Sequence, residues 1–241
     1  INRVLITGGT LNIAASASQG LKSDSLVCIS GGNITISKSH EGIESPYIRI
    51  QGGNSYITAS DDGINASKGN GGENNDGSLL SIEGGYLIIN ATGDDGLDSN
   101  GNITMSGGTA IVNGPQSQPE VELDYNGTFN LTGGFLIASG VNSNMVQGVS
   151  SSSTQYSLKI STSSSLSSST LLHIQDAAGN DVVTFKGLRN YSSVIFSSDA
   201  LSKGSSYSIY TGGTYNGTLT DGIYTDGTYS GGTLKKTFTI S

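Results

Sequence analysis

The chain has 241 residues with a formal net charge of −8; 36 residues are glycine, 12% are charged and only 3 are proline. This composition is typical of proteins built from many short strands and tight turns. The negative charge repels nucleic acid and anionic membrane surfaces, and no segment approaches the ~18 consecutive apolar residues of a membrane-spanning helix. We therefore expect neither a nucleic-acid partner nor a membrane span.

The charge divides the chain into two regions. Residues 1–150 carry 5 basic and 14 acidic side chains, whereas residues 151–241 carry 6 basic and 5 acidic ones. The repetitive pattern described below also stops near Val149. We therefore predict one unit over 1–149 and a second, Ser/Tyr/Gly-rich β segment over 150–241.

Glycine pairs recur along the first unit and define six coils, most of them a little over twenty residues long. The pairs are Gly8-Gly9, Gly31-Gly32, Gly52-Gly53, Gly84-Gly85, Gly107-Gly108 and Gly133-Gly134. Apolar residues alternate with polar ones before and after each pair, and a third apolar position follows at Leu21, Ile43, Ile64, Leu97, Leu123 and Val146. An insertion around Ser67–Gly77 lengthens the third coil.

Three apolar strand segments per coil predict an all-β fold, a three-sided parallel β-helix of about six coils. Each coil cannot bury its own apolar face, but stacked coils share a continuous interior. The glycine pairs suit bends between sheets, where positive φ or close backbone approach is needed. The alternative is a β-sandwich of hairpins, which predicts two-residue turns that are sparse before residue 150.

We predict that the second unit forms antiparallel strands that cap or flank the β-helix. The serine-rich segments 150–153 and 161–169 are expected to be loops, and 170–185 to be a hairpin; further strands are expected near 193–197, 207–210 and 236–240. Outward positions after the glycine pairs form an apolar strip on the later coils: Tyr56, Tyr86, Ile88, Ile111, Phe135 and Ile137. We expect another part of the chain to cover this strip, the alternative being an aromatic platform for sugar rings.

Acidic residues align in columns beside the third apolar position. The candidate metal ligands are Glu41, Glu44, Asp61, Asp62, Asn65, Asp94, Asp95, Asp98, Glu120, Glu122 and Asp124. Parallel strands lie ~4.8 Å apart, so carboxylates in register repel one another unless they take up protons or bind a cation. Calcium suits this set better than magnesium or zinc, because it accepts six to eight oxygen ligands. The alternative is a solvated acidic turn in which Asp serves turn geometry.

The repeated phrases Asp61-Asp62-Gly63-Ile64 and Asp94-Asp95-Gly96-Leu97, each following a glycine pair, precede a Tyr/Gly-rich tail. In this order they resemble a clostridial group of carbohydrate-binding proteins similar to polysaccharide lyases. The resemblance implies a right-handed parallel β-helix that holds several calcium ions between coils. It also implies export to the cell surface and binding of cellulose or pectic polygalacturonate. The calcium ligands it implies are Glu41, Glu44, Asp61, Asp62, Asp94, Asp95, Asp98, Glu122 and Asp124.

The expected function is a non-catalytic, exported and monomeric binder of plant cell-wall polysaccharide with structural calcium. One alternative is a calcium-dependent pectate lyase, in which Lys22 or Lys38 would act as the base. A second alternative is a structural adhesin without sugar binding.

Overall fold

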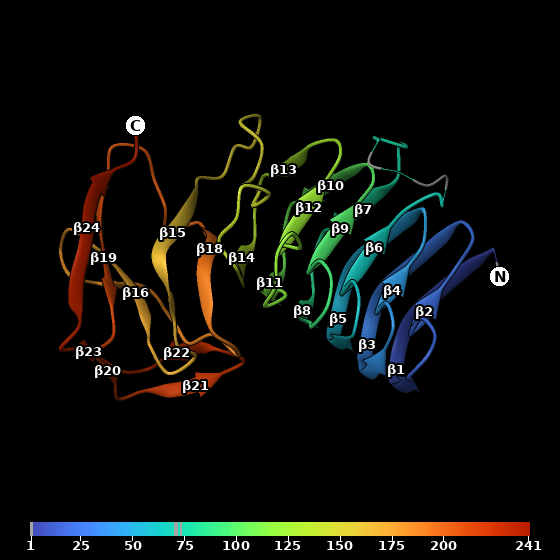
Figure 1. The fold of residues 1–241 in the computed structure, drawn as a ribbon, viewed down its shortest axis with the longest axis horizontal. Coiled ribbons are helices and arrows are strands. Elements are labelled where there is room, and N and C mark those ends of the chain that lie inside the picture. The colour runs from blue at the N-terminus through green and yellow to red at the C-terminus, as the bar shows by residue number, and fades with distance from the viewer. Residues whose placement is uncertain (1, 70–71, 73) are drawn as a thin grey trace.

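The computed structural model describes residues 2–69, 72 and 74–241. Figure 1 shows stacked coils that begin at the N-terminus and end against a group of antiparallel strands at the C-terminal end. Over the described residues the secondary structure is all-β, and no helix there is long and apolar enough to cross a bilayer. The insertion at 67–77 includes residues 70, 71 and 73, which lie outside the described residues.

The largest sheet contains the strands on both sides of each glycine pair. Its solenoid strands are β1 (Arg3–Ala15), β3 (Leu26–Ser39), β5 (Tyr47–Ala59), β7 (Leu79–Ile82), β8 (Tyr86–Ala91), β10 (Asn102–Met105), β11 (Thr109–Asn113), β13 (Phe129–Leu131) and β14 (Phe135–Gly140). All are parallel: β5, for example, pairs with β7 before its glycine pair and with β8 after it. Two sides of each coil therefore come from one sheet bent at the glycines.

The third side is a five-stranded parallel sheet of short strands. These are β2 (Leu21–Lys22), β4 (Ile43–Glu44), β6 (Ile64–Ala66), β9 (Leu97–Ser99) and β12 (Leu123–Tyr125). Their apolar residues stack in register from Leu21 to Leu123, as the repeat predicts. Together with the inward residues of the large sheet they form one aliphatic core along the solenoid.

The glycine pairs occupy the predicted bends. The second glycine of each pair has positive φ, for instance 79° at Gly53. The first lies against the coil below, because a Cβ on Gly84 would meet the carbonyl oxygen of Gln51 at 2.6 Å. Both positions therefore disfavour side chains from the second pair onward, whereas the first glycine of the first pair, Gly8, has no coil below it and nothing within 4 Å of its Cβ position.

The second unit is antiparallel and continues the solenoid sheet. β18 (Tyr191–Ser197) pairs with β14, and β15 (Ser157–Leu166) pairs with β18. A six-stranded sheet contains β16 (Leu172–Asp176), β17 (Asp181–Phe185), β19 (Ser206–Thr211), β21 (Thr218–Thr220), β22 (Ile223–Thr225) and β24 (Thr233–Thr239), and β20 (Thr214–Tyr215) pairs with β23 (Tyr229–Ser230). The predicted hairpin at 170–185 is confirmed as β16 and β17, which pair directly.

The serine-rich segment 161–169 is only partly the loop expected from its composition. Residues 161–166 belong to β15, an edge strand whose backbone bonds to β18 while several of its serine side chains face solvent. Composition was misleading here because strand pairing by an edge strand requires only backbone groups.

A second apolar core lies between the solenoid and the six-stranded sheet. Ile111 and Ile137 of the predicted strip are 1% and 0% exposed there, and Tyr86, Ile88 and Phe135 pack against the same cluster. The C-terminal unit thus both caps the last coil and covers the strip, as predicted. Tyr56, at the end of the strip, remains 41% exposed.

Candidate metal centre along the acidic corner

The Asp-Asp-Gly phrases lie at the corner that leads into the five-stranded sheet. Their backbones bond from coil to coil, with Gly42 N donating to Asp62 O and Gly63 N donating to Asp95 O, both at 2.9 Å. A Cβ on Gly63 would lie 2.4 Å from the Gly96 oxygen. Glycine at this position lets adjacent coils approach closely, which brings their aspartates one above another.

The predicted column after the third apolar position is in register. Lys22 pairs with Glu44, Glu44 with Asn65, Asn65 with Asp98, and Asp98 with Asp124. One column therefore contains a cation at its first coil and oxygen-bearing side chains on the next four.

Among the described residues, the carboxylates gather into four overlapping groups. Their members, each within 4.8 Å of one another through one ligand atom, are His40/Glu41/Asp61, Asp61/Asp62/Asp94, Asp94/Asp95/Glu120 and Asp95/Asp98/Asp124. These residues together with Asn65 are called the acid ladder below. Because three aspartates are shared between groups, the acid ladder is continuous over several coils. Eight of the predicted carboxylate ligands and Asn65 are brought together in this way, and Glu44 lies one coil below.

Two aspartates of the acid ladder are buried and hold the next coil. Asp62 and Asp95 are each 7% exposed. An Asp62 Oδ1 accepts a hydrogen bond from Asp95 N at 3.0 Å, and Asp95 Oδ1 accepts one from Val121 N at 2.5 Å. Burial, with the charges of Asp98 and Asp94, raises the pKa of Asp62 to about 10. Burial raises the pKa of Asp95 to about 8, although the Val121 N–H opposes the shift.

The more exposed carboxyls are perturbed as well. Burial, followed by hydrogen bonding with Glu44, raises the pKa of Glu41 to about 7. Hydrogen bonding with Asp94 raises the pKa of Glu120 to about 7. Without a bound cation, several of these groups are therefore protonated near neutral pH, as expected for carboxylates forced into register.

A lysine and a histidine lie beside acidic side chains in the first coils. Lys22 Nζ lies 2.6 Å from a Glu44 oxygen, and His40 Nδ1 lies 3.2 Å from an Asp61 oxygen. Burial acts to raise the pKa of Glu44, but hydrogen bonds from Glu41 and Lys22 outweigh burial and lower this pKa. Glu44 is thus already paired with a protein cation.

Glu122 lies apart from the acid ladder. It occupies the column that is glycine in the coils below, so its side chain points into the protein, where it is 0% exposed. Its Oε1 accepts a hydrogen bond from Ser193 of β18 at 2.6 Å. The column of Gly42, Gly63 and Gly96 identifies this inward position, which an alignment of acidic residues alone does not.

One buried oxygen in the acid ladder, Asn65 Oδ1, has no hydrogen-bond partner. The Asn65 amide nitrogen donates to Glu41 and Asp62, at 3.2 and 3.1 Å, so its oxygen is left for another ligand. A cavity of about 500 Å³ borders Asp62, Asn65 and Asp98. Oxygen donors of this kind fit a hard divalent cation, and the donor set fits calcium.

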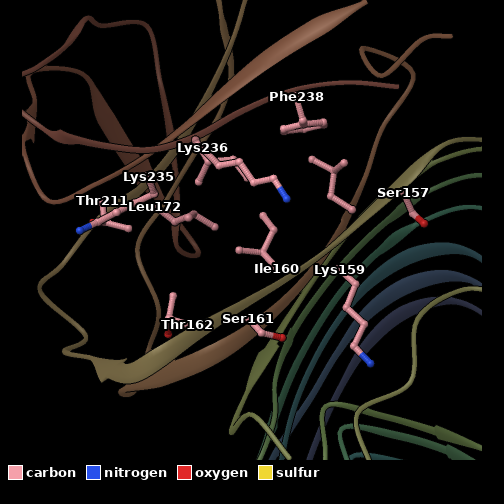
Figure 2. A pocket seen from close by; sticks show the side chains of 12 residues that line it. Ser157, Lys159, Ile160, Ser161, Thr162, Leu172, Thr211, Lys235, Lys236 and Phe238 are labelled. Carbon is pink, nitrogen blue, oxygen red and sulfur yellow. The ribbon is translucent and has the colours of Figure 1, made fainter. Parts of the chain in front are cut away.

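Among the other cavities, two are relevant to the C-terminal unit and its boundary with the solenoid. One, of about 480 Å³, separates β15 from β24; Ile160 lies on one side and Lys236 and Phe238 on the other (Figure 2). It is the open edge of two packed sheets, and an inward-facing lysine on an edge strand protects such an edge from further pairing. The other cavity borders Tyr56 and is considered below.

Comparison with known protein families decides the broad function. A family described as carbohydrate-binding domain-containing protein matches residues 2–235, which include both units. The chain belongs to this family. No curated protein and no solved structure matches it.

Proposed function

We propose that this carbohydrate-binding domain acts outside the cell and binds pectic polygalacturonate of the plant cell wall, with calcium ions held along the acid ladder. The observation that carries the proposal is the continuous series of oxygen ligands, which includes the buried Asn65 Oδ1 without a hydrogen-bond partner. Burial, with smaller effects from neighbouring acidic groups, raises the pKa values of Glu41, Asp62 and Asp95.

In this proposal the residues of the acid ladder have two roles, fixing adjacent coils and binding the metal. Asp62 and Asp95 fix adjacent coils through their backbone hydrogen bonds, and their carboxylates would also be among the groups that hold the metal. Asp94, Asp98, Glu120 and Asp124 offer oxygens at the solvent side. Bound calcium would supply the positive charge that lets a carboxylate polymer approach an acidic surface. Cellulose is the second polymer of the proposal, and as a neutral chain it needs a different surface.

The pectate-lyase alternative receives no support from Lys22. A base must be neutral to accept a proton, but hydrogen bonding with Glu44 raises the pKa of Lys22 and keeps it protonated. Absorbance of unsaturated uronide, measured with polygalacturonate and calcium, should therefore stay at background. A rise that Lys22→Ala or Lys38→Ala abolishes would establish the enzyme instead.

The proposal is tested by calorimetric titration of the full chain with oligogalacturonate, in calcium and after chelation. We expect binding in calcium, its loss after chelation, and a loss of about tenfold or more in Asp94→Asn, which removes a charge shared by two groups of the acid ladder. Asp199→Asn, an exposed acid outside the acid ladder, is the matched control and should bind normally. Equal binding with and without calcium would contradict the proposal, and no binding of oligogalacturonate under either condition would rule out pectic polygalacturonate as the ligand.

A further inference from the structure

A groove lies where the C-terminal unit stops covering the outer face of the solenoid. Its volume is about 500 Å³, which is within the usual range of ligand sites. Outward residues of β5 and β8 form its floor, and its walls come from the segment after β17 and from the turn between β21 and β22. The groove is lined by, among others, Tyr56, Lys186, Leu188, Leu219 and Asp221.

Exposed apolar surface gathers at this groove. Tyr56, Leu188 and Leu219 are 41%, 58% and 42% exposed, and all three line the cavity. They come from three separate segments, yet the fold brings them to one hollow. Apolar surface concentrated in a concave site indicates a ligand more strongly than the same residues scattered would.

The ring of Tyr56 is held by its neighbours Tyr86 and Asp221 before any ligand binds. Asp221 and Gly222 form the two-residue turn between β21 and β22, with φ of 48° and 92°, as in a type I′ hairpin. That turn directs the Asp221 carboxylate to the solenoid, where Tyr86 Oη donates to it at 2.9 Å. Burial, followed by the charge and hydrogen bonding of Asp221, raises the pKa of Tyr56. Tyr56 and Tyr86 lie 6.3 Å apart between ring centroids, so the exposed ring leans on its neighbour.

The polar groups of the groove favour a ligand without net charge. Lys186 and Asp221 offer one charge of each sign, and Thr58 and Asn90 add neutral groups on the floor. The acid-ladder residues that border the cavity at the acidic corner do not line this groove. An exposed aromatic ring flanked by hydrogen-bonding groups suits a sugar, which has an apolar C–H face and a rim of hydroxyls.

We propose that this groove is a calcium-independent binding site for a neutral β-linked hexose chain, with the Tyr56 ring as its stacking surface. Thr35 and Asn12 continue the row of Tyr56 across β3 and β1, so a flat chain longer than the groove can extend over that sheet face. Asp221 and Lys186 bond the hydroxyls. The inference deepens the proposed function and rests on the chain's membership of a carbohydrate-binding family.

The test is calorimetric titration of the full chain with cellohexaose, with maltohexaose as the α-linked comparison. We expect cellohexaose to bind equally in calcium and in chelator, and more tightly than maltohexaose. Tyr56→Ala should weaken cellohexaose binding about tenfold or more, whereas Tyr56→Phe, which keeps the ring, should retain most of it. Tyr47→Ala is the matched control, because Tyr47 lies on the same strand with the same 41% exposure but outside the groove.

Absence of cellohexaose binding, an equal loss in Tyr47→Ala, or unchanged binding in Tyr56→Ala would overturn the groove. A preference for maltohexaose would overturn the β-linked ligand. Oligogalacturonate binding in calcium separates this result from the acid ladder: Tyr56→Ala should leave it unchanged, and Asp94→Asn should leave cellohexaose binding unchanged. Either site can therefore fail without the other.

Discussion

At the scale of single residues, buried carboxyls make the stability of the calcium-free protein depend on pH. A carboxyl whose pKa is raised by folding favours the native state when protonated, so its contribution is present at low pH and is lost as pH rises toward the folded-state value. For Asp95 and Asp62 that value is about 8 and about 10, against an ordinary 3.8. Carboxyls with a lowered pKa, such as Glu83, lose their contribution only below the ordinary value of 4.5.

We therefore predict that the calcium-free chain melts at a higher temperature at about pH 5 than at about pH 9. Scanning calorimetry after exhaustive dialysis against chelator measures this. With calcium the dependence should weaken or reverse, because the metal binds ionised carboxylates and acid displaces it. If the melting temperature of the calcium-free chain instead decreased as the pH was lowered from 9 to 5, these aspartates would be ionised in the native protein.

At the scale of the coil, close stacking depends on glycines that a side chain cannot replace. A Cβ on Gly63 would lie 2.2 Å from Ile89 Cγ2 and 2.4 Å from the Gly96 oxygen, so either the strand or the coil above must move. Gly63→Ala should lower the free energy of unfolding by about 1–3 kcal/mol or more. Gly8→Ala is the control, since nothing lies within 4 Å of its Cβ. Urea denaturation of both variants checks the difference; equal stabilities would mean that the coils are not packed this tightly.

Periodicity predicted the elements that depend on neighbouring coils. The rows from Leu21 to Leu123 and from Glu44 to Asp124 follow from a repeated spacing, because each coil places equivalent residues one strand apart. The pairing of β18 with β14 and β15 has no such signal. It joins segments far apart in the chain by backbone bonds, and its serine-rich partner resembles a loop in composition.

The same distinction explains the candidate site. Carboxylates could be aligned from the sequence, but their direction could not: Glu122 points inward to Ser193, while its neighbours Val121 and Asp124 keep the usual directions of the coil. The use of Asp62 and Asp95 as caps for the next coil also depends on close approach between coils. The sequence placed Tyr56 in an apolar strip that another part of the chain was expected to cover. Only the position of the β21–β22 turn shows that the C-terminal unit stops covering this strip beside Tyr56.

At the scale of the whole molecule, the two units create two different surfaces. The C-terminal unit lies against the last coils of the solenoid (Figure 1). The solenoid concentrates negative charge in one corner, whereas the C-terminal unit is nearly neutral and borders the groove at Tyr56. A single elongated domain could in this way hold an acidic polymer through metal at one place and a neutral chain through stacking at another.

We propose that divalent cations lie among the aligned carboxylates, and their number can be measured. Equilibrium dialysis of the chelator-treated chain against radioactive calcium counts the ions directly. We expect more than one calcium ion bound per chain at neutral pH, fewer in Asp94→Asn, and an unchanged number in Asp199→Asn. No calcium bound above background by the correctly folded chain would contradict it.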